Sequence, residues 1–202
     1  MATTDMDTVN SPLRADARRN RARLLAAALA AFTERGSDDT SLEEIARRAG
    51  VGIGTLYRHF PTRQALLESV YRDQVDALCA RGRDLLAEPS PAAGLSGWLR
   101  ALVTFSLTKR SLTSELLAGT GGKNAPVFSA CRTEMTETAA ALLARAQQAG
   151  QVRAGIEPVD LLRISHAAVA ATGHAADPGT EAYRLLEIML GGVLAAEGGP
   201  AP

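Results

Sequence analysis

The amino-acid sequence predicts an all-α protein. Alanine is the commonest of its 202 residues, runs of β-branched and aromatic residues are scarce, and apolar residues recur at helical spacing between glycine and proline breaks. A hydrophobic fraction of 46% and a charged fraction of 22% are typical of a globular protein. No segment has the ~20 apolar residues that cross a bilayer. The first residues lack the blocks of a signal peptide and only two cysteines occur, so we expect a cytoplasmic protein without a membrane partner.

Nine helices are expected from this pattern, most of them begun by proline or ended by glycine. They cover about residues 17–35, 41–50, 53–59, 62–87, 95–105, 111–118, 126–149, 158–172 and 178–196. The polar, irregular composition at the two ends predicts a disordered arm over residues 1–15 and a disordered tail over residues 198–202.

Charge is unevenly distributed along a chain whose formal net charge is zero. Residues 14–72 hold eleven arginines and seven acidic residues, a balance of +4, whereas residues 1–13 and 73–202 each have a balance of −2. A basic N-terminal third indicates an anionic partner at that end. The arginines that precede or begin the first helix are Arg14, Arg18, Arg19, Arg21 and Arg23. They form either an arm that reaches phosphates or an adjacent minor groove, or a solvated charged segment.

Residues 41–60 have the pattern of a helix-turn-helix. Ser41 can cap a short helix, with Glu44 as its reciprocal capping partner. Gly50 can adopt the positive φ that ends this helix and starts the turn. A second short helix follows and ends at Phe60-Pro61. Two short helices joined by a glycine-containing turn are the unit with which many proteins read DNA.

Several runs of residues in and around this unit make the pattern more specific. They are Leu42-Glu43-Glu44-Ile45-Ala46, Ala49-Gly50-Val51, Gly54-Thr55-Leu56-Tyr57-Arg58-His59-Phe60-Pro61 and Ala65-Leu66. With these runs, residues 18–78 resemble the DNA-binding domain of the tetracycline-repressor (TetR) family of bacterial transcription regulators. The sequence departs from the family at Gly52, where serine is common, and at Arg63, where lysine is commoner. The resemblance implies a DNA-binding domain over residues 16–78 and an effector-binding and dimerisation domain over residues 79–197.

Ten residues of this segment are candidate DNA contacts. They are Ser41, Gly52, Ile53, Gly54, Thr55, Tyr57, Arg58, His59, Thr62 and Arg63. The resemblance assigns the base at position 63 to a phosphate, and the hydroxyls of Thr55 and Tyr57 can donate to phosphate oxygens. Gly54 lets the main chain approach the DNA closely.

Ile53 opens the second short helix, where a glutamine or arginine would read a base edge through paired hydrogen bonds. An isoleucine offers only apolar contact, most naturally to a thymine methyl group, and Arg58 is then expected to read a guanine. The alternative is that Ile53 packs beneath the helix as core, three residues before Leu56.

The resemblance implies that the C-terminal domain dimerises and holds a pocket for a small-molecule effector. The last two expected helices also carry more apolar residues than one buried face uses, which favours a two-fold interface and a palindromic operator. The expected interface residues are Leu161, Leu162, Ser165, Val169, Leu186, Met189, Leu190 and Val193. The candidate pocket residues, each of which can instead be plain core, are Leu78, Trp98, Leu102, Phe105, Phe128, Cys131, Met135 and His166.

The sequence offers no arrangement for catalysis. The three histidines His59, His166 and His174 are widely spaced, no His/Cys/carboxylate group has metal spacing, and no phosphate-binding loop or nucleophile elbow occurs. We therefore expect no enzyme activity, no cofactor and no metal. The expected function is a DNA-binding transcriptional repressor that a small-molecule effector releases from its operator. The alternatives are an activator of the same fold, and a ligand-binding or protein-interaction module whose helix-turn-helix is vestigial.

Overall fold

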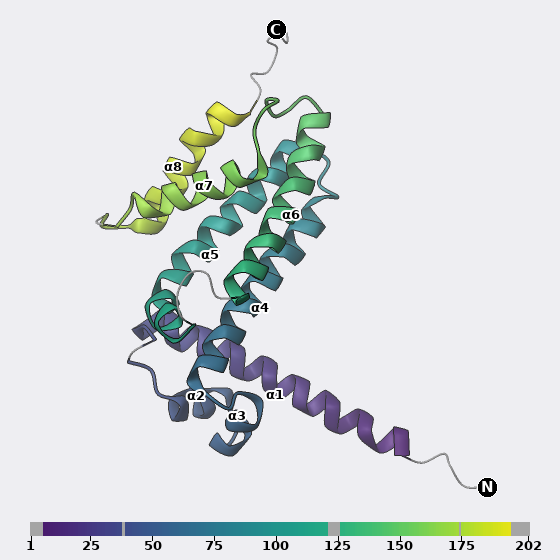
Figure 1. Ribbon diagram of the computed structural model, residues 1–202, viewed down its shortest axis with the longest axis vertical. Coiled ribbons are helices and arrows are strands. Elements are labelled where there is room, and N and C mark those ends of the chain that lie inside the picture. The colour runs from purple at the N-terminus through teal and green to yellow at the C-terminus, as the bar shows by residue number, and fades with distance from the viewer. Residues whose placement is uncertain (1–5, 38, 121–125, 174, 195–202) are drawn as a thin grey trace, which may run out of the picture. The chain divides into compact units, whose positions relative to one another are not determined.

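The structure, a computed structural model, describes residues 6–37, 39–120, 126–173 and 175–194, with side chains from residue 14 onward except 110–115 and 117–120. These residues form eight helices (Figure 1). They are α1 (Met6–Arg35), α2 (Leu42–Ala49), α3 (Ile53–His59), α4 (Arg63–Leu85), α5 (Pro91–Thr120), α6 (Pro126–Gln148), α7 (Pro158–Ala170) and α8 (Pro178–Val193). One isolated antiparallel bridge pairs Val152 with Leu194. The expected all-α class is confirmed. His174 and the tail expected over residues 198–202 lie outside the described residues.

The described residues form eight helices rather than nine because α5 continues through an expected break. Helices around 95–105 and over 111–118 were expected, and the structure joins them in one helix, Pro91–Thr120. Residues 105–118 contain neither glycine nor proline, so nothing interrupts the hydrogen bonds between each amide and the carbonyl four residues earlier.

The first helix begins earlier than expected. Residues 1–15 were expected to be a disordered arm, but α1 begins at Met6. Residues 14 and 16–19 are all exposed, so these positions of α1 add no buried residue to the core. Alanine and arginine are strong helix formers, and Arg19 forms an ion pair with Asp16 one turn away. Extending an existing helix needs no new nucleus, so these turns add to the packed part of α1.

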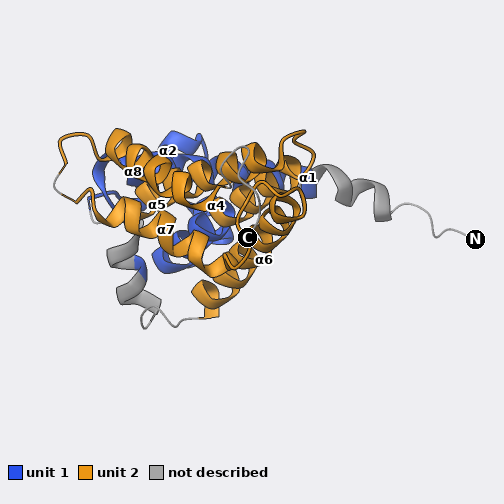
Figure 2. Ribbon diagram, turned by 90° about the horizontal axis from the view of Figure 1, so that it is seen from above, with its two compact units in different colours: residues 1–73, 111–122 blue, residues 74–110, 123–202 orange. Residues whose placement is uncertain are grey.

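The chain divides into two compact units (Figure 2). The first comprises residues 1–73 and 111–122, and the second comprises residues 74–110 and 123–202. This division differs from the expected boundary at residue 78 and moves residues 111–122 into the first unit. A 30-residue helix is ~45 Å long, so the two ends of α5 pack in different units; Leu116, near its C-terminal end, is 1% exposed.

The core of the first unit is built on α1. Apolar residues of α1, α2, α3 and α4 form this core, in which α2 contacts both α1 and α3, and all of these residues are at most 3% exposed. The core residues include Leu24, Leu25, Ala28, Phe32, Ile45, Ala46, Leu56, Leu66 and Leu67. Because α2 and α3 are short, most of their burial comes from this shared core.

The second unit centres on Trp98 of α5, which is fully buried. Its indole Nε1–H donates to the main-chain carbonyl of Leu78 in α4 at 3.1 Å. Gly82, one turn later in α4, lies so close to α6 that an added Cβ would be 2.2 Å from the Thr138 Cγ2 and 3.0 Å from the Trp98 ring. The absence of a side chain at Gly82 therefore sets the separation of α4, α5 and α6.

The contact at Gly82 predicts opposite effects for two Gly→Ala substitutions. Gly82→Ala should lower the free energy of unfolding by about 2 kcal/mol, because the new methyl group forces Thr138 and Trp98 apart. Gly97→Ala in α5 should raise it by about 0.5 kcal/mol through helix propensity, since its Cβ would meet only Leu85 methyl groups at 3.7 Å. Urea denaturation of both variants checks this, and equal effects would contradict the close packing at Gly82.

Candidate nucleic-acid interface

Local interactions define α2. The Ser41 Oγ accepts a hydrogen bond from the Glu44 amide at 3.1 Å, as expected of an N-cap. Gly50 has a φ of +64° and ends the helix, and the Val51 amide then donates to the Ala46 carbonyl at 3.0 Å. The Glu44 carboxylate was expected to reach back to Ser41; it instead accepts from Arg35 and Arg48.

The next helix, α3, presents most of the candidate DNA contacts. Ile53 is 38% exposed and Tyr57 is 46% exposed, and Gly52, Gly54 and Arg58 are also at the surface. Thr55 and His59 are half-buried, and Leu56 is the fully buried residue that anchors the helix. Ile53 therefore lies on the outer surface of α3 rather than in the core.

An ion-pair network holds α2 against α1. Arg48 of α2 donates to the Glu34 carboxylate of α1 at 2.7 Å and to Glu44 at 2.8 Å. Arg35 of α1 reaches the other oxygen of Glu44 at 2.9 Å. The hydrogen bonds that Arg48 donates to Glu34, and secondly to Glu44, raise the pKa of its guanidinium. Only the four-residue spacing of Glu44 and Arg48 could have signalled this network in the sequence.

Arg63, for which a phosphate contact is predicted, also has partners within the chain. Its guanidinium turns inward and donates to the main-chain carbonyl of Thr40 at 2.7 Å and to that of Ser37. It also lies 5.6 Å from the centroid of the Phe32 ring. Arg63 thus fastens the loop between α1 and α2 to the start of α4. The adjacent Thr62 is exposed and its Oγ1 accepts from the Ala65 amide at 3.0 Å, capping α4.

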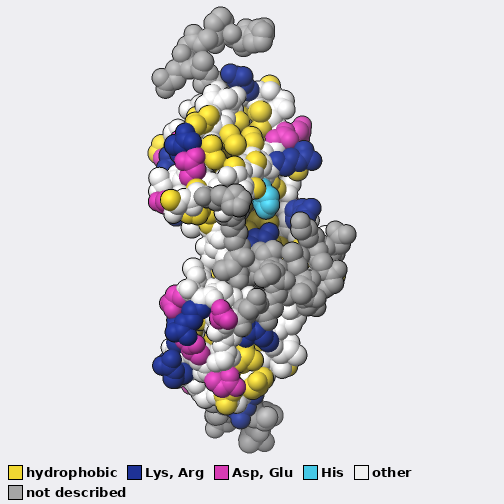
Figure 3. All heavy atoms as spheres, turned by 90° about the vertical axis from the view of Figure 1, so that its left-hand side faces the viewer, with side chains coloured by type: hydrophobic (Ala, Val, Ile, Leu, Met, Phe, Trp, Pro, Cys, Tyr) yellow, Lys and Arg dark blue, Asp and Glu magenta, His cyan; other side chains and the backbone are white. Residues whose placement is uncertain are grey.

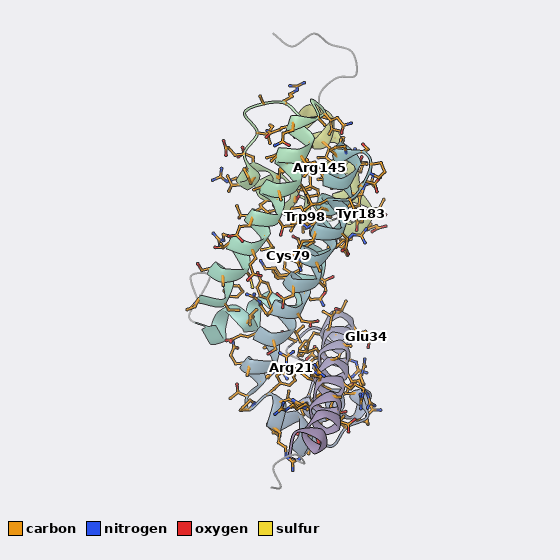
Figure 4. All side chains as sticks on the ribbon, turned by 90° about the vertical axis from the view of Figure 1, so that its right-hand side faces the viewer. Arg21, Glu34, Cys79, Trp98, Arg145 and Tyr183 are labelled. Carbon is orange, nitrogen blue, oxygen red and sulfur yellow. The ribbon has the colours of Figure 1, made fainter. Side chains whose placement is uncertain are left out.

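Two arginines of α1 contact the helix-turn-helix. The Arg21 guanidinium lies 5.5 Å from the centroid of the Phe60 ring, which directly follows α3. The Arg23 guanidinium lies against Gly50, because a Cβ added there would be 2.5 Å from its Nη2. Figure 4 labels Arg21 and Glu34 at separate turns of α1. These two arginines therefore connect α1 to the residue that ends α2 and to the residue that follows α3.

The exposed surface of α3 suits a polyanion. The helix sequence, Ile-Gly-Thr-Leu-Tyr-Arg-His, contains no acidic residue. Arg58 supplies positive charge, and the hydroxyl groups of Tyr57 and Thr55 can donate to phosphate oxygens. A seven-residue helix with such a face has the size and chemistry to enter a DNA major groove.

Two family models match the chain over most of its length. The model described as bacterial regulatory proteins, tetR family, matches residues 24–70. A second, described as transcriptional regulator SbtR-like, C-terminal domain, matches residues 90–195, more than half of the chain. The chain belongs to the TetR family of bacterial transcriptional regulators. This is a family of DNA-binding regulators, not of enzymes.

Solved structures resemble the chain over nearly their full length. A TetR transcriptional regulator from Streptomyces coelicolor is 37% identical with a TM-score of 0.75, and the alignment covers 87% of this chain and 99% of that one. A TetR regulatory protein from Mycobacterium vanbaalenii is 35% identical with a TM-score of 0.74, over 91% of this chain and 100% of that one.

A curated relative matches the chain over less than half of its own length. The HTH-type transcriptional repressor KstR2 of Mycobacterium tuberculosis is 37% identical over 82 residues, which are 40% of this chain. The chain spans only 41% of the length of that repressor.

The candidate effector-pocket residues all lie in the second unit of this TetR protein. Leu78, Trp98, Leu102, Phe128, Cys131 and Met135 are buried, Phe105 is half-buried and His166 is exposed. The indole N–H of Trp98 donates to the Leu78 carbonyl, so this polar group already has a partner within the chain. Nearby, burial raises the pKa of the Cys79 thiol, against a smaller opposing hydrogen bond with Thr138.

The residues expected at the dimer interface are placed mainly in the chain's own core. Leu161, Ser165, Val169, Leu186, Leu190 and Val193 are at most 4% exposed, and Leu162 and Met189 are half-buried. The first six face inward: α7 contacts both α6 and α8, and these residues of α7 and α8 are buried there. The opposite sides of α7 and α8 carry Val159, 40% exposed, and Ile188, 62% exposed. Figure 3 shows hydrophobic side chains gathered on the face that α7 and α8 occupy.

An open hollow at the turn between α7 and α8 is lined by Ala171, Ala175, Ala176, Asp177, Thr180 and Glu181, none of them a candidate pocket residue. No group of three or more metal-ligating side chains is found among the residues described. Within the same part of the chain, no helix is long and apolar enough to cross a membrane.

The inward role of Arg63 predicts a loss of stability on its removal. Arg63→Ala should lower the free energy of unfolding by about 2 kcal/mol, because two carbonyls lose a charged donor. Arg58→Ala, at an exposed position of α3, should change it by less than about 0.5 kcal/mol. Thermal or urea unfolding of the two variants makes the comparison. A stable Arg63→Ala variant would return Arg63 to the set of solvent-facing DNA contacts.

Proposed function

We propose that this TetR protein is a homodimeric transcriptional repressor that binds a palindromic operator and is released by a small-molecule effector. The observation that carries the proposal is the outer surface of α3, which exposes Ile53, Tyr57 and Arg58 without any acidic residue. The relative KstR2 is named a transcriptional repressor, and its matched segment spans 82 residues. This likeness supports repression rather than activation.

Each of the candidate contacts on α3 has a separate part in DNA recognition. Tyr57 and Thr55 donate to phosphate oxygens and set the position of the helix in the groove. Ile53, 38% exposed at the first turn, contacts a thymine methyl group, and Arg58 reads a guanine. The exposed Gly54 leaves room for the sugar-phosphate backbone beside the helix.

The exposed side of α7 and α8 supports dimerisation. Val159 and Ile188 are exposed, and Leu162 and Met189 are half-buried on the same two helices. A chain that leaves large aliphatic residues exposed on neighbouring helices gains free energy by covering them with a second copy. A two-fold axis at this face would present two α3 helices to two half-sites, which makes the operator palindromic.

Release requires an effector with different affinities for the DNA-bound and free arrangements of the dimer. The buried apolar residues around Leu102, Phe128 and Met135 in the second unit favour an effector that is mostly apolar.

The hydroxyl of Tyr57 provides a sharp test of DNA binding. A duplex is first recovered from a random-sequence library with the wild-type protein, and fluorescence anisotropy then measures affinity over a range of salt concentrations. Tyr57→Phe should weaken binding about tenfold through the loss of phosphate hydrogen bonds. Tyr183→Phe is the matched control, since its hydroxyl bonds the Thr104 hydroxyl at 2.6 Å, far in sequence from α3.

The selection itself also tests the assignment of Ile53. The recovered half-site should contain a thymine at the position that Ile53 contacts, and Ile53→Ala should relax this preference. Weak binding that is alike for every duplex, and alike for Tyr57→Phe and wild type, would favour a ligand-binding module with an unused helix-turn-helix.

A charge on the exposed face of α8 should separate the two copies. Ile188→Glu places a carboxylate at the two-fold interface twice in each dimer, and should weaken association by more than about a hundredfold. Ala144→Glu, at an exposed position of α6, introduces the same charge elsewhere and should leave association unchanged. Sedimentation velocity gives both results. A dimer that persists in Ile188→Glu would move the interface away from this face.

A further inference from the structure

We propose that the N-terminal part of α1, from Arg14 to Arg21, lies along the DNA backbone that flanks the half-site read by α3. Each protomer then holds more DNA than its helix-turn-helix covers. This inference rests on the proposed function, because it adds a second contact with the same DNA.

The spacing of the arginines places three of them on one face of α1. Arg14, Arg18 and Arg21 are followed by Leu25 at intervals of four, three and four residues, so all four recur on the same side of the helix. Leu25 is 3% exposed and belongs to the core of the first unit. The three arginines are exposed and therefore continue the inward stripe of α1 beyond the end of that core.

The contact of Arg21 orients this face relative to α3. Its guanidinium covers the ring of Phe60, which is 1% exposed and directly follows the last residue of α3. At a rise of ~1.5 Å per residue, Arg18 and Arg14 stand ~4.5 Å and ~10 Å further along the same face. Figure 1 shows this part of α1 projecting past α2 and α3 within the first unit.

Between Arg14 and Arg21, the one arginine on the opposite side of α1 has an acidic partner. Arg19 forms an ion pair with Asp16, and both side chains are exposed on the side of α1 away from Leu25. The net positive charge of these turns therefore belongs to Arg14, Arg18 and Arg21. Two of them, Arg14 and Arg18, are ~6 Å apart along the helix axis. Phosphates of one DNA strand advance ~3.4 Å per nucleotide along the duplex axis, so this separation is close to the advance over two nucleotides.

DNA is the occupant that the first unit favours. The same unit carries α3, whose exposed surface suits a polyanion. A duplex held by α3 would bring its flanking phosphates near the face of α1 that carries Arg14, Arg18 and Arg21. A guanidinium forms charge-assisted hydrogen bonds with phosphate oxygens and displaces condensed counterions from the duplex. A salt-dependent measurement therefore counts these contacts directly.

The test compares single variants on the two faces of α1. Arg14→Ala and Arg18→Ala should each flatten the slope of log affinity against log salt by about 0.9 per protomer. Arg19→Ala removes the same charge from the opposite face and should leave the slope unchanged. Alanine preserves the helix because it has the highest helix propensity. Circular dichroism confirms that each variant keeps the wild-type helix content.

Hydroxyl-radical footprinting on the selected duplex locates the contact. The wild type and Arg19→Ala should protect sugars outside the half-sites, and the double variant R14A/R18A should lose that protection while keeping the protection inside them. Slopes and footprints that are the same in all variants, with tight specific binding retained, would overturn this inference and leave the proposed function standing. A wild-type protein that selects no sequence would overturn both.

Discussion

The exposed surface of α3 depends on holding a helix of only seven residues in place. An isolated helix shorter than ~12 residues is unstable in water, so α3 persists through what surrounds Ile53–His59. Leu56 is fully buried beneath it, the turn at Gly50 fixes its start, and Phe60 is enclosed at its end under Arg21. The orientation of Tyr57 and Ile53 thus depends on the whole first unit. Helix α1 contacts both α2 and the residue that follows α3.

Arginine has two opposite uses in that unit. Arg48 and Arg63 satisfy carboxylates and main-chain carbonyls and hold helices together, whereas Arg14, Arg18 and Arg58 remain at the surface. A planar guanidinium with five donors serves both purposes, since a carbonyl pair and a phosphate present similar acceptors. Twenty of the 22 basic residues are arginine, so residue type alone does not separate the two uses.

The last two helices show the same ambiguity for apolar residues. One stripe of α7 and α8, which includes Leu161 and Leu186, packs inside the chain, and another stripe, which includes Val159 and Ile188, lies at the surface. Adjacent residues of a helix differ in direction by ~100°, so a sequence with two apolar faces does not reveal which one is core. Leu162 and Met189 lie between the two stripes and are half-buried.

The features that the sequence determined are local ones. Ser41 caps α2, Gly50 ends it with a positive φ, and Leu56 points inward, because each depends on residues within one or two turns. The family pattern in residues 41–60 identified the exposed face of α3 for the same reason. The tertiary structure alone decided the continuity of α5 and which stripes of α7 and α8 are buried. It also decided that Arg63 binds Ser37 and Thr40, since their carbonyls lie more than twenty residues away in the chain and meet Arg63 only after α1 and α4 have packed.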